Sequence, residues 1–145
     1  MKQLVLTMIF LLSCLGVSQA EMVSIAGEMV NMRSGPGENY EVVWELGKGY
    51  PLKVIDKQDD WLKVTDYQDD TGWVQKDLVD RKAYFVVKAK IVNIRSGPGE
   101  KYKLVRQAQN GVVLRTLETK SGWVKVKHEE EDVTGWVVRS ALWGW

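Results

Sequence analysis

The sequence predicts an all-β protein made of two tandem small β-barrels behind an N-terminal signal peptide. Three observations support this fold class. Residues 30–40 recur as residues 92–102 with nine of eleven positions identical. Short stretches of alternating apolar and polar residues lie between turn-forming Gly, Pro and Asp residues. Beyond the first twenty residues, no stretch carries the long apolar face of an amphipathic helix.

The first element is a secretory signal over residues 1–20. Lys2 supplies the positive start, an apolar run covers residues 4–17, and Ser18 and Ala20 occupy the −3 and −1 positions of a cleavage site. The run is shorter than the about 20 apolar residues that span a membrane. No second apolar run follows, so we expect no stable membrane span in the mature chain. We expect an exported protein, either periplasmic or secreted.

Cys14 is the only cysteine, so no intrachain disulfide is expected. Residues 11–14 weakly resemble the cleavage box of a bacterial lipoprotein, in which the cysteine becomes lipidated. Cleavage after Ala20 is favoured, because the apolar segment before Cys14 is short and Leu12 is bulky for a residue near the cut. That cleavage leaves a mature chain without a thiol, which suits an oxidising compartment. Lipidation at Cys14 stays open as the alternative.

Within each copy the expected strands follow one another between turns. Residues 28–32 and 61–64 alternate apolar and polar side chains, as half-buried strands do. Residues 34–37, 47–49 and 69–72 are rich in Gly, Pro and Asp and are typical of turns. Several short strands at regular spacing indicate a small sandwich or barrel. A barrel also removes the free edges at which a small sheet aggregates.

The offset between the copies predicts the domain boundaries. It is 62 residues through most of the copy, and one extra residue in the second copy then aligns the Gly-Trp-Val segments at residues 72–74 and 135–137. We expect an acidic barrel over residues 21–80 and a basic barrel over residues 81–145. The four residues 80–83 reach at most about 13 Å, so the two barrels should lie nearly in contact.

The motif series resembles the bacterial SH3-like domain. Both copies carry, in order, Asn-x-Arg-Ser-Gly-Pro, a Gly-ended turn, a Trp-x-x-Val strand and a closing Gly-Trp-Val. The resemblance implies a barrel of five to seven strands, an extracytoplasmic location, and binding of cell-wall material or of a protein partner. Such modules often accompany a wall hydrolase domain, and this sequence shows none, which weakens any inference of wall remodelling.

The two copies carry opposite net charges. Residues 21–80 contain 6 basic and 13 acidic residues, a net charge of −7, whereas residues 81–145 contain 13 basic and 6 acidic residues, a net charge of +7. A nucleic-acid binder usually shows a basic excess, so we expect no nucleic-acid partner. Two hypotheses follow. Either the charges bias how the barrels dock, within a screening length of about 8 Å, or the basic copy meets an anionic partner.

We expect no enzyme, no cofactor and no metal site. The only histidine, His128, lies in the charged segment 127–132, which is typical of a solvated hairpin tip. Its neighbouring carboxylates lack the spacing of structural metal ligands. The acidic pairs at residues 59–60 and 69–70 fall in turns, where Asp bonds the local backbone. No Cys or His pairing supports nucleophilic catalysis.

The Arg-Ser-Gly-Pro-Gly loops are expected to be structural. A phosphate-binding loop opens a helix with its amides converging on the anion. These loops should connect two strands instead, and Pro36 and Pro98 each remove one donor. We predict that Arg33 and Arg95 bond carbonyl groups of the loops.

Aromatic side chains are the better candidates for ligand contact. Four tryptophans recur in both copies and are expected mainly in the barrel cores: Trp61, Trp73, Trp123 and Trp136. Trp44 aligns with Arg106, so the fold requires no aromatic residue there, and an exposed Trp can stack on a sugar or peptide. Packing of Trp44 against the other barrel is the equal alternative. Tyr40 and Tyr102 follow the Gly-Pro-Gly loops, where a structural role is favoured over ligand contact. We expect Trp143 and Trp145 at the C-terminus to cap the second barrel, with an anchor presented to a partner as the alternative.

These observations lead to one main functional prediction and two alternatives. The candidate ligand-binding residues are Trp44, Tyr40, Tyr102 and Arg106. We expect a non-catalytic extracytoplasmic protein that recognises peptidoglycan or its stem peptides, with two linked modules adding avidity on a repeating polymer. One alternative is an envelope adaptor that binds an extended peptide of another protein. The other is a domain pair that positions a separate wall hydrolase. The sequence leaves the oligomeric state open.

Overall fold

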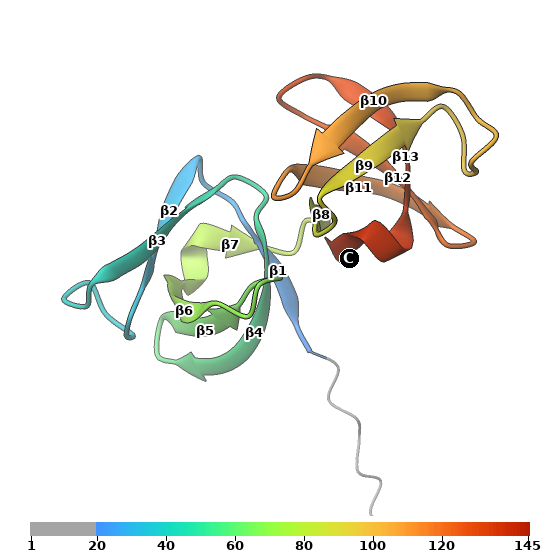
Figure 1. Cartoon of the computed structure of the whole chain (residues 1–145). Helices are drawn as coiled ribbons and strands as arrows, with labels where there is room; N and C mark the ends of the chain where they lie inside the picture. The colour runs from blue at the N-terminus through green and yellow to red at the C-terminus, as the bar shows by residue number, and fades with distance from the viewer. Residues whose placement is uncertain (1–19) are drawn as a thin grey trace, which may run out of the picture.

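A computed structural model describes residues 20–145 and folds them into two antiparallel β-sheets (Figure 1). Cys14 and the signal peptide predicted over residues 1–20, except Ala20, lie outside the described residues. Within the described part of the chain, no helix has the length and apolar character that crossing a membrane requires. Two short 3₁₀ turns, Lys76–Leu78 (η1) and Arg139–Ala141 (η2), are the helical elements of this part.

Each sheet contains seven strands, and the two sheets have the same strand order. The first module consists of β1 (Met22–Ile25), β2 (Met29–Arg33), β3 (Val42–Gly47), β4 (Pro51–Gln58), β5 (Trp61–Thr65), β6 (Thr71–Gln75) and β7 (Val79–Asp80). The second module consists of β8 (Tyr84–Val87), β9 (Ile91–Arg95), β10 (Leu104–Gln109), β11 (Val113–Lys120), β12 (Trp123–His128), β13 (Val133–Val138) and β14 (Leu142–Gly144). The orders are β3-β2-β6-β5-β4-β1-β7 and β10-β9-β13-β12-β11-β8-β14. The sequence repeat is therefore a structural repeat, and the all-β prediction is confirmed.

The sheets keep free edges. The first order ends at β3 and β7 and the second at β10 and β14. The expectation that barrel closure removes the edges is therefore wrong, because no hydrogen-bonded seam among the described strands joins the two ends of either sheet. At the C-terminus, β14 pairs with β8, and the Thr116 hydroxyl donates to the carbonyl of Trp145 at 2.6 Å. The predicted folding back of the C-terminal residues onto the second module is confirmed.

Each module has its own aliphatic core. β2 and β9 bury alternate residues, Val30 and Met32 in one and Val92 and Ile94 in the other, as period-2 strands do. The remaining core positions are also mostly Val, Leu and Ile. Two separate cores fit two modules that each fold around their own apolar residues.

The prediction that the repeated tryptophans lie mainly in these cores is wrong for three of the four. Trp61, Trp73 and Trp123 are half-buried, whereas Trp136 is buried, although neither aliphatic cluster includes it. Strand alternation explains the error. Leu62 and Val124, which directly follow two of these tryptophans, point inward, so the indoles point to the other face.

The two modules contact one another at a tyrosine and a glycine. Tyr84, the first residue of β8, is 3% exposed, and a Cβ atom placed on Gly49 would lie 2.6 Å from a carbon of its ring. The Tyr67 hydroxyl of the first module also donates to the Asn110 side-chain oxygen of the second at 3.1 Å. The prediction that the modules lie nearly in contact is confirmed.

Candidate functional site

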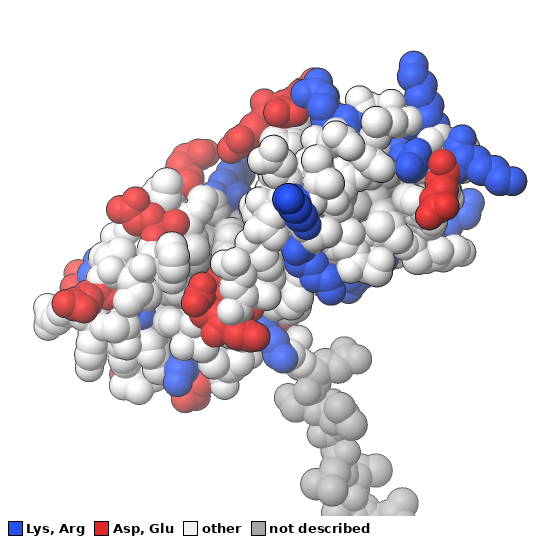
Figure 2. All heavy atoms as spheres, in the orientation of Figure 1, with Lys and Arg blue, Asp and Glu red and all other residues white. Residues whose placement is uncertain are grey.

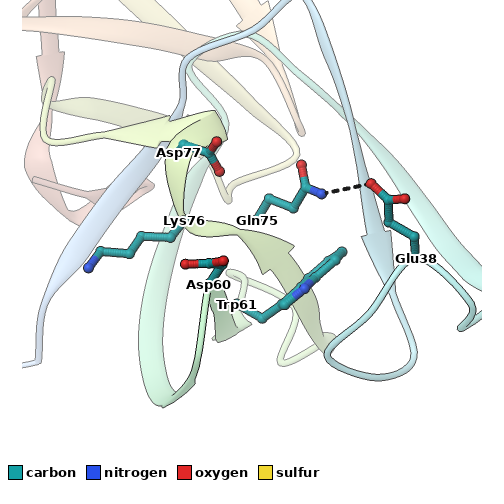
Figure 3. A pocket seen from close by; sticks show the side chains of 6 residues that line it. All are labelled: Glu38, Asp60, Trp61, Gln75, Lys76 and Asp77. Carbon is teal, nitrogen blue, oxygen red and sulfur yellow. Dashed lines mark hydrogen bonds between the residues drawn. The ribbon is translucent and has the colours of Figure 1, made fainter.

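An open pocket of about 620 Å³ lies on the first module beside Trp61 (Figure 3). We call it the Trp61 pocket. It is lined by Glu38, Asp60, Trp61, Gln75, Lys76 and Asp77. Three separate parts of the chain meet there: the β2–β3 loop, the β4–β5 turn and the end of β6 with η1.

The hairpin turn and the 3₁₀ turn hold one wall of the pocket. Asp60 lies in the tight turn between β4 and β5, and Trp61 begins β5. Trp61 pairs with Gln75 across the strands, so the indole and the amide come from adjacent positions. The backbone N–H of Lys76 donates to the Asp60 carbonyl at 2.8 Å and fixes η1, with Asp77, against the turn.

The opposite wall is the β2–β3 loop, which contributes Glu38. The Gln75 side-chain amide donates to the Glu38 carboxylate at 3.1 Å, as Figure 3 shows. The Arg33 guanidinium donates to the carbonyls of Glu38 at 3.0 Å and Tyr40 at 2.9 Å. These bonds hold the loop in place, and the predicted role of Arg33 is confirmed.

Tyr40 and Tyr102 are built alike in the two modules. Each ring covers a glycine of its loop, Gly35 or Gly97, and leaves no room for a side chain there. Arg95 donates to the Tyr102 carbonyl at 3.1 Å, which confirms its predicted role. Both tyrosines are about half exposed, at 48% and 50%. The inner side of each ring supports the loop, and the rest of the ring stays accessible from solvent.

Trp44 and Arg106 occupy equivalent positions on β3 and β10, opposite Met32 and Ile94. Trp44 is 54% exposed, so about half of its side chain is accessible from solvent. The Arg106 guanidinium pairs with the Glu131 carboxylate at 2.8 Å. Neither residue lines the Trp61 pocket. Of the four predicted ligand contacts, only Tyr40 belongs to a loop that forms this pocket.

Sequence reasoning missed the polar residues of the Trp61 pocket. The sequence pattern places Asp60 in a turn and gives no functional signal for Glu38, Gln75 or Asp77. These residues could have been found by comparing the two copies position by position. The positions equivalent to Asp60, Gln75, Lys76 and Asp77 hold Gly122, Val138, Arg139 and Ser140. The second module keeps the indole, Trp123, and a carboxylate, Glu100, at the position of Glu38, but lacks the other two carboxylates and the amide.

The chemistry of the Trp61 pocket favours ligands that donate hydrogen bonds. Three carboxylates and one amide surround the indole. The ammonium group of Lys76 extends away from Trp61 in Figure 3. Carboxylates accept from amide N–H groups, hydroxyls and ammonium groups, and an indole face stacks on a flat or apolar surface. The site therefore suits a ligand that combines such donors with a sugar face or an extended peptide.

A second cleft, of about 590 Å³, lies at the junction of the modules and includes Tyr50, Tyr84 and Glu129. The Tyr84 hydroxyl donates to the Glu129 carboxylate at 2.5 Å. This bond, with nearby cationic side chains, holds the pKa of Glu129 below its usual value. Burial first, and then the bond to Asp66, raises the pKa of Tyr50. Both tyrosines therefore act as hydrogen-bond donors within the protein.

Comparison with known proteins places this geometry in a family. The family model described as the bacterial SH3 domain matches twice, over residues 26–81 and 88–144. A curated protein of Bacillus subtilis (strain 168), named "Putative N-acetylmuramoyl-L-alanine amidase YrvJ", is 27% identical over 136 residues. The match covers 86% of this chain and 26% of that protein, so the chain spans about a quarter of the relative's length.

Several solved structures are similar as well. NlpC1 and NlpC2 from Trichomonas vaginalis share 14% and 15% identity with this chain, with TM-scores of 0.39 and 0.38. An NlpC/P60 family protein from Bacillus cereus ATCC 10987 shares 12% identity, with a TM-score of 0.39. Each match covers 86% of this chain and 45%, 48% and 56% of the respective structures. The two family matches cover most of the sequence, and the protein therefore belongs to the bacterial SH3 domain family.

Proposed function

We propose that this protein is a non-catalytic, extracytoplasmic binding protein that recognises peptidoglycan or its stem peptides. The observation that carries the proposal is the Trp61 pocket, in which an accessible indole lies among carboxylate and amide acceptors. Membership of the bacterial SH3 domain family and the resemblance to a protein named as an N-acetylmuramoyl-L-alanine amidase support a ligand from the cell wall.

The pocket matches the groups that such a ligand presents. Peptidoglycan offers amide N–H groups, hydroxyls and sugar faces, and its peptides offer amines and carboxylates. Asp60, Asp77 and Glu38 accept from the donors, while Trp61 stacks against the sugar or the peptide. Tyr40 is half-exposed on the loop that supplies Glu38 and is a further candidate for contact. Trp44, Tyr102 and Arg106 are secondary candidates for contact, because they lie outside the pocket.

A non-catalytic role is proposed from the composition of the site. The lining residues include no serine, cysteine or histidine, and the Glu38 carboxylate is held by Gln75. An open pocket of this kind binds a single fragment weakly. Two modules joined by a short linker gain avidity when both engage one polymer. In the second module, Arg139 stands where the first has Lys76, next to Ser140 instead of Asp77, and suits carboxylate groups of the same polymer.

Co-sedimentation with purified cell-wall sacculi at physiological salt tests the proposal. The test variant combines Gln75→Val with Asp77→Ser, which installs the residues of the second module at equivalent strand and 3₁₀ positions. We expect saturable binding by residues 20–145 and at least about a tenfold weaker binding by the variant, as loss of two polar contacts gives. The matched control makes the same types of change at exposed positions outside the pocket, Gln68→Val with Glu118→Ser, and should keep full binding.

Two outcomes would contradict this proposal. If folded protein stays in the supernatant, the ligand is not the wall polymer, and a saturable complex with one envelope protein would favour the adaptor function. If the test variant and the control bind equally well, the Trp61 pocket is not the binding site.

A further inference from the structure

The two sheets end in strands with exposed apolar side chains. β3 and β10 are the terminal strands of their sheets, and each pairs with one neighbour, β2 or β9. In β3, Val42, Val43 and Trp44 are 45%, 41% and 54% exposed, and in β10, Leu104 and Val105 are each 45% exposed. An edge strand presents unpaired N–H and C=O groups, and natural proteins usually protect such edges with charges, prolines or a covering segment.

The apolar side chains of β3 and β10 are left partly uncovered by the protein itself. About half of each of these side chains stays exposed in the two-module protein, so neither a core nor the neighbouring module encloses them. Since successive side chains of a strand point to opposite faces, three consecutive exposed apolar residues leave both faces of β3 uncovered. A partner that adds a strand satisfies the backbone groups and buries the side chains together.

Charge indicates which partner fits. Glu41 and Glu45 flank the apolar run of β3, whereas Lys103 and Arg106 flank that of β10. The difference extends to the whole modules, with net charges of −7 and +7 over residues 21–80 and 81–145. In Figure 2, acidic side chains predominate over the first module, and Lys and Arg predominate at the far end of the second. The β3 edge and the β10 edge are therefore complementary in charge.

Few of the opposite charges of the two modules are used in ion pairs within residues 20–145. Of the four ion pairs in residues 20–145, three lie within a single module: Lys57–Glu21, Arg106–Glu131 and Lys127–Asp132. The fourth, Arg81 to Glu21 at 3.2 Å, lies at the linker. The modules instead contact one another through Tyr84 on Gly49. Arg106 is therefore already paired, whereas Glu41, Glu45 and Lys103 form none of these ion pairs and are available to another molecule.

We propose that β3 of one copy pairs with β10 of a second copy, so that this protein self-associates head to tail. An antiparallel pairing centred on the middle valines produces three matched cross-strand pairs: Val43–Val105, Trp44–Leu104 and Glu45–Lys103. Apolar and opposite-charge pairs at facing positions stabilise a sheet. Pairing β3 with another β3 in the same way sets Glu41 against Glu45 and is disfavoured.

The symmetry of this contact makes it testable. Because each copy offers one β3 and one β10, the contact is heterologous and produces chains or closed rings. The weight-average molar mass of residues 20–145 should therefore rise with protein concentration. It should pass that of a dimer if chains or larger rings form, and stop at that of a dimer if the ring closes at two copies. Raising NaCl from about 0.05 M to about 0.5 M shortens the screening length and should weaken the association about fivefold or more.

The decisive experiment is sedimentation velocity on two single variants, alone and mixed. Val43→Lys disables β3 and leaves β10 intact, and Val105→Glu does the reverse. Both positions are exposed, so folding should be kept, and circular dichroism checks it. We expect each variant alone to be at least about tenfold weaker in association. An equimolar mixture should associate, because the intact β10 of one variant meets the intact β3 of the other.

A matched control and three outcomes decide the proposal. Ile55→Lys changes an equally exposed side chain on β4, an interior strand of the sheet, and should leave association unchanged. The proposal is overturned if the wild-type protein stays monomeric up to several hundred micromolar. It is also overturned if Val105→Glu alone still associates, which indicates β3–β3 contact, or if Ile55→Lys is as disruptive as Val43→Lys.

Discussion

The contact between the modules predicts that two equivalent glycines respond differently to the same substitution. Gly49 and Gly111 have φ values of +81° and +86°, so Gly→Ala costs about 1–2 kcal/mol at either position through the left-handed backbone alone. Only at Gly49 would the new methyl group clash. Its added Cβ would lie 2.6 Å from the Tyr84 ring, whereas that of Gly111 would lie at an ordinary contact distance, 3.7 Å, from the Tyr67 hydroxyl oxygen.

The size of the difference follows from how firmly Tyr84 is held. Its side chain is buried and its hydroxyl donates to Glu129, so the ring cannot swing away without losing that bond. Overpacking of this kind costs about 1–3 kcal/mol. We therefore expect Gly49→Ala to lower the free energy of unfolding by about 2–5 kcal/mol in total, and Gly111→Ala by about 1–2 kcal/mol.

Urea unfolding of both variants measures the two losses, and a double-mutant cycle with Tyr84→Ala isolates the ring contact. The excess loss in Gly49→Ala should disappear when the ring is absent. Small-angle scattering should detect an altered module arrangement in Gly49→Ala only. Equal losses for the two glycines, or an excess that persists without the Tyr84 ring, would refute the assigned contact.

Two further predictions concern single side chains. Trp44→Ala should keep most of its sacculus binding, because Trp44 lies outside the Trp61 pocket, but should weaken self-association; strong loss of sacculus binding would instead extend the ligand site to β3. The pKa of Glu129 is lowered mainly by the Tyr84 hydroxyl. Its contribution to stability is therefore complete above the ordinary glutamate pKa of 4.5 and is lost as pH falls through the lower pKa of the folded state. Unfolding of Glu129→Gln at several pH values should show a weaker loss of stability on acidification than the wild type, and an identical pH profile would contradict this.

Features that depend on local chemistry or on repetition could be predicted from the sequence. The 62-residue repeat predicted two copies of one all-β module, because duplicated patterns fold alike. The loop-bonding roles of Arg33 and Arg95 followed from the prolines that exclude an anion cradle. The short linker predicted contact between the modules.

Features that depend on which face of a strand points into the core could not be predicted from the sequence. Trp61 and Leu62 are both apolar, and only the pairing register decides that Leu62 enters the core while Trp61 borders the pocket. The pocket itself joins Glu38 to Gln75, 37 positions apart, through a contact that no local pattern encodes. The open edges at β3 and β10 likewise depend on the order of strands in each sheet. The sequence pattern predicts closed barrels, which have no edge strands.

The most direct test of the central claim is an NMR titration of residues 20–145 with soluble glycan–peptide fragments of peptidoglycan, following the indole N–H signals. Trp61 and Trp123 occupy equivalent positions, and only Trp61 lies among Asp60, Gln75 and Asp77. The account predicts a saturable shift of the Trp61 signal with a much smaller change at Trp123. A titration that moves Trp123 alone, or leaves both signals unchanged while the protein stays folded, would contradict it.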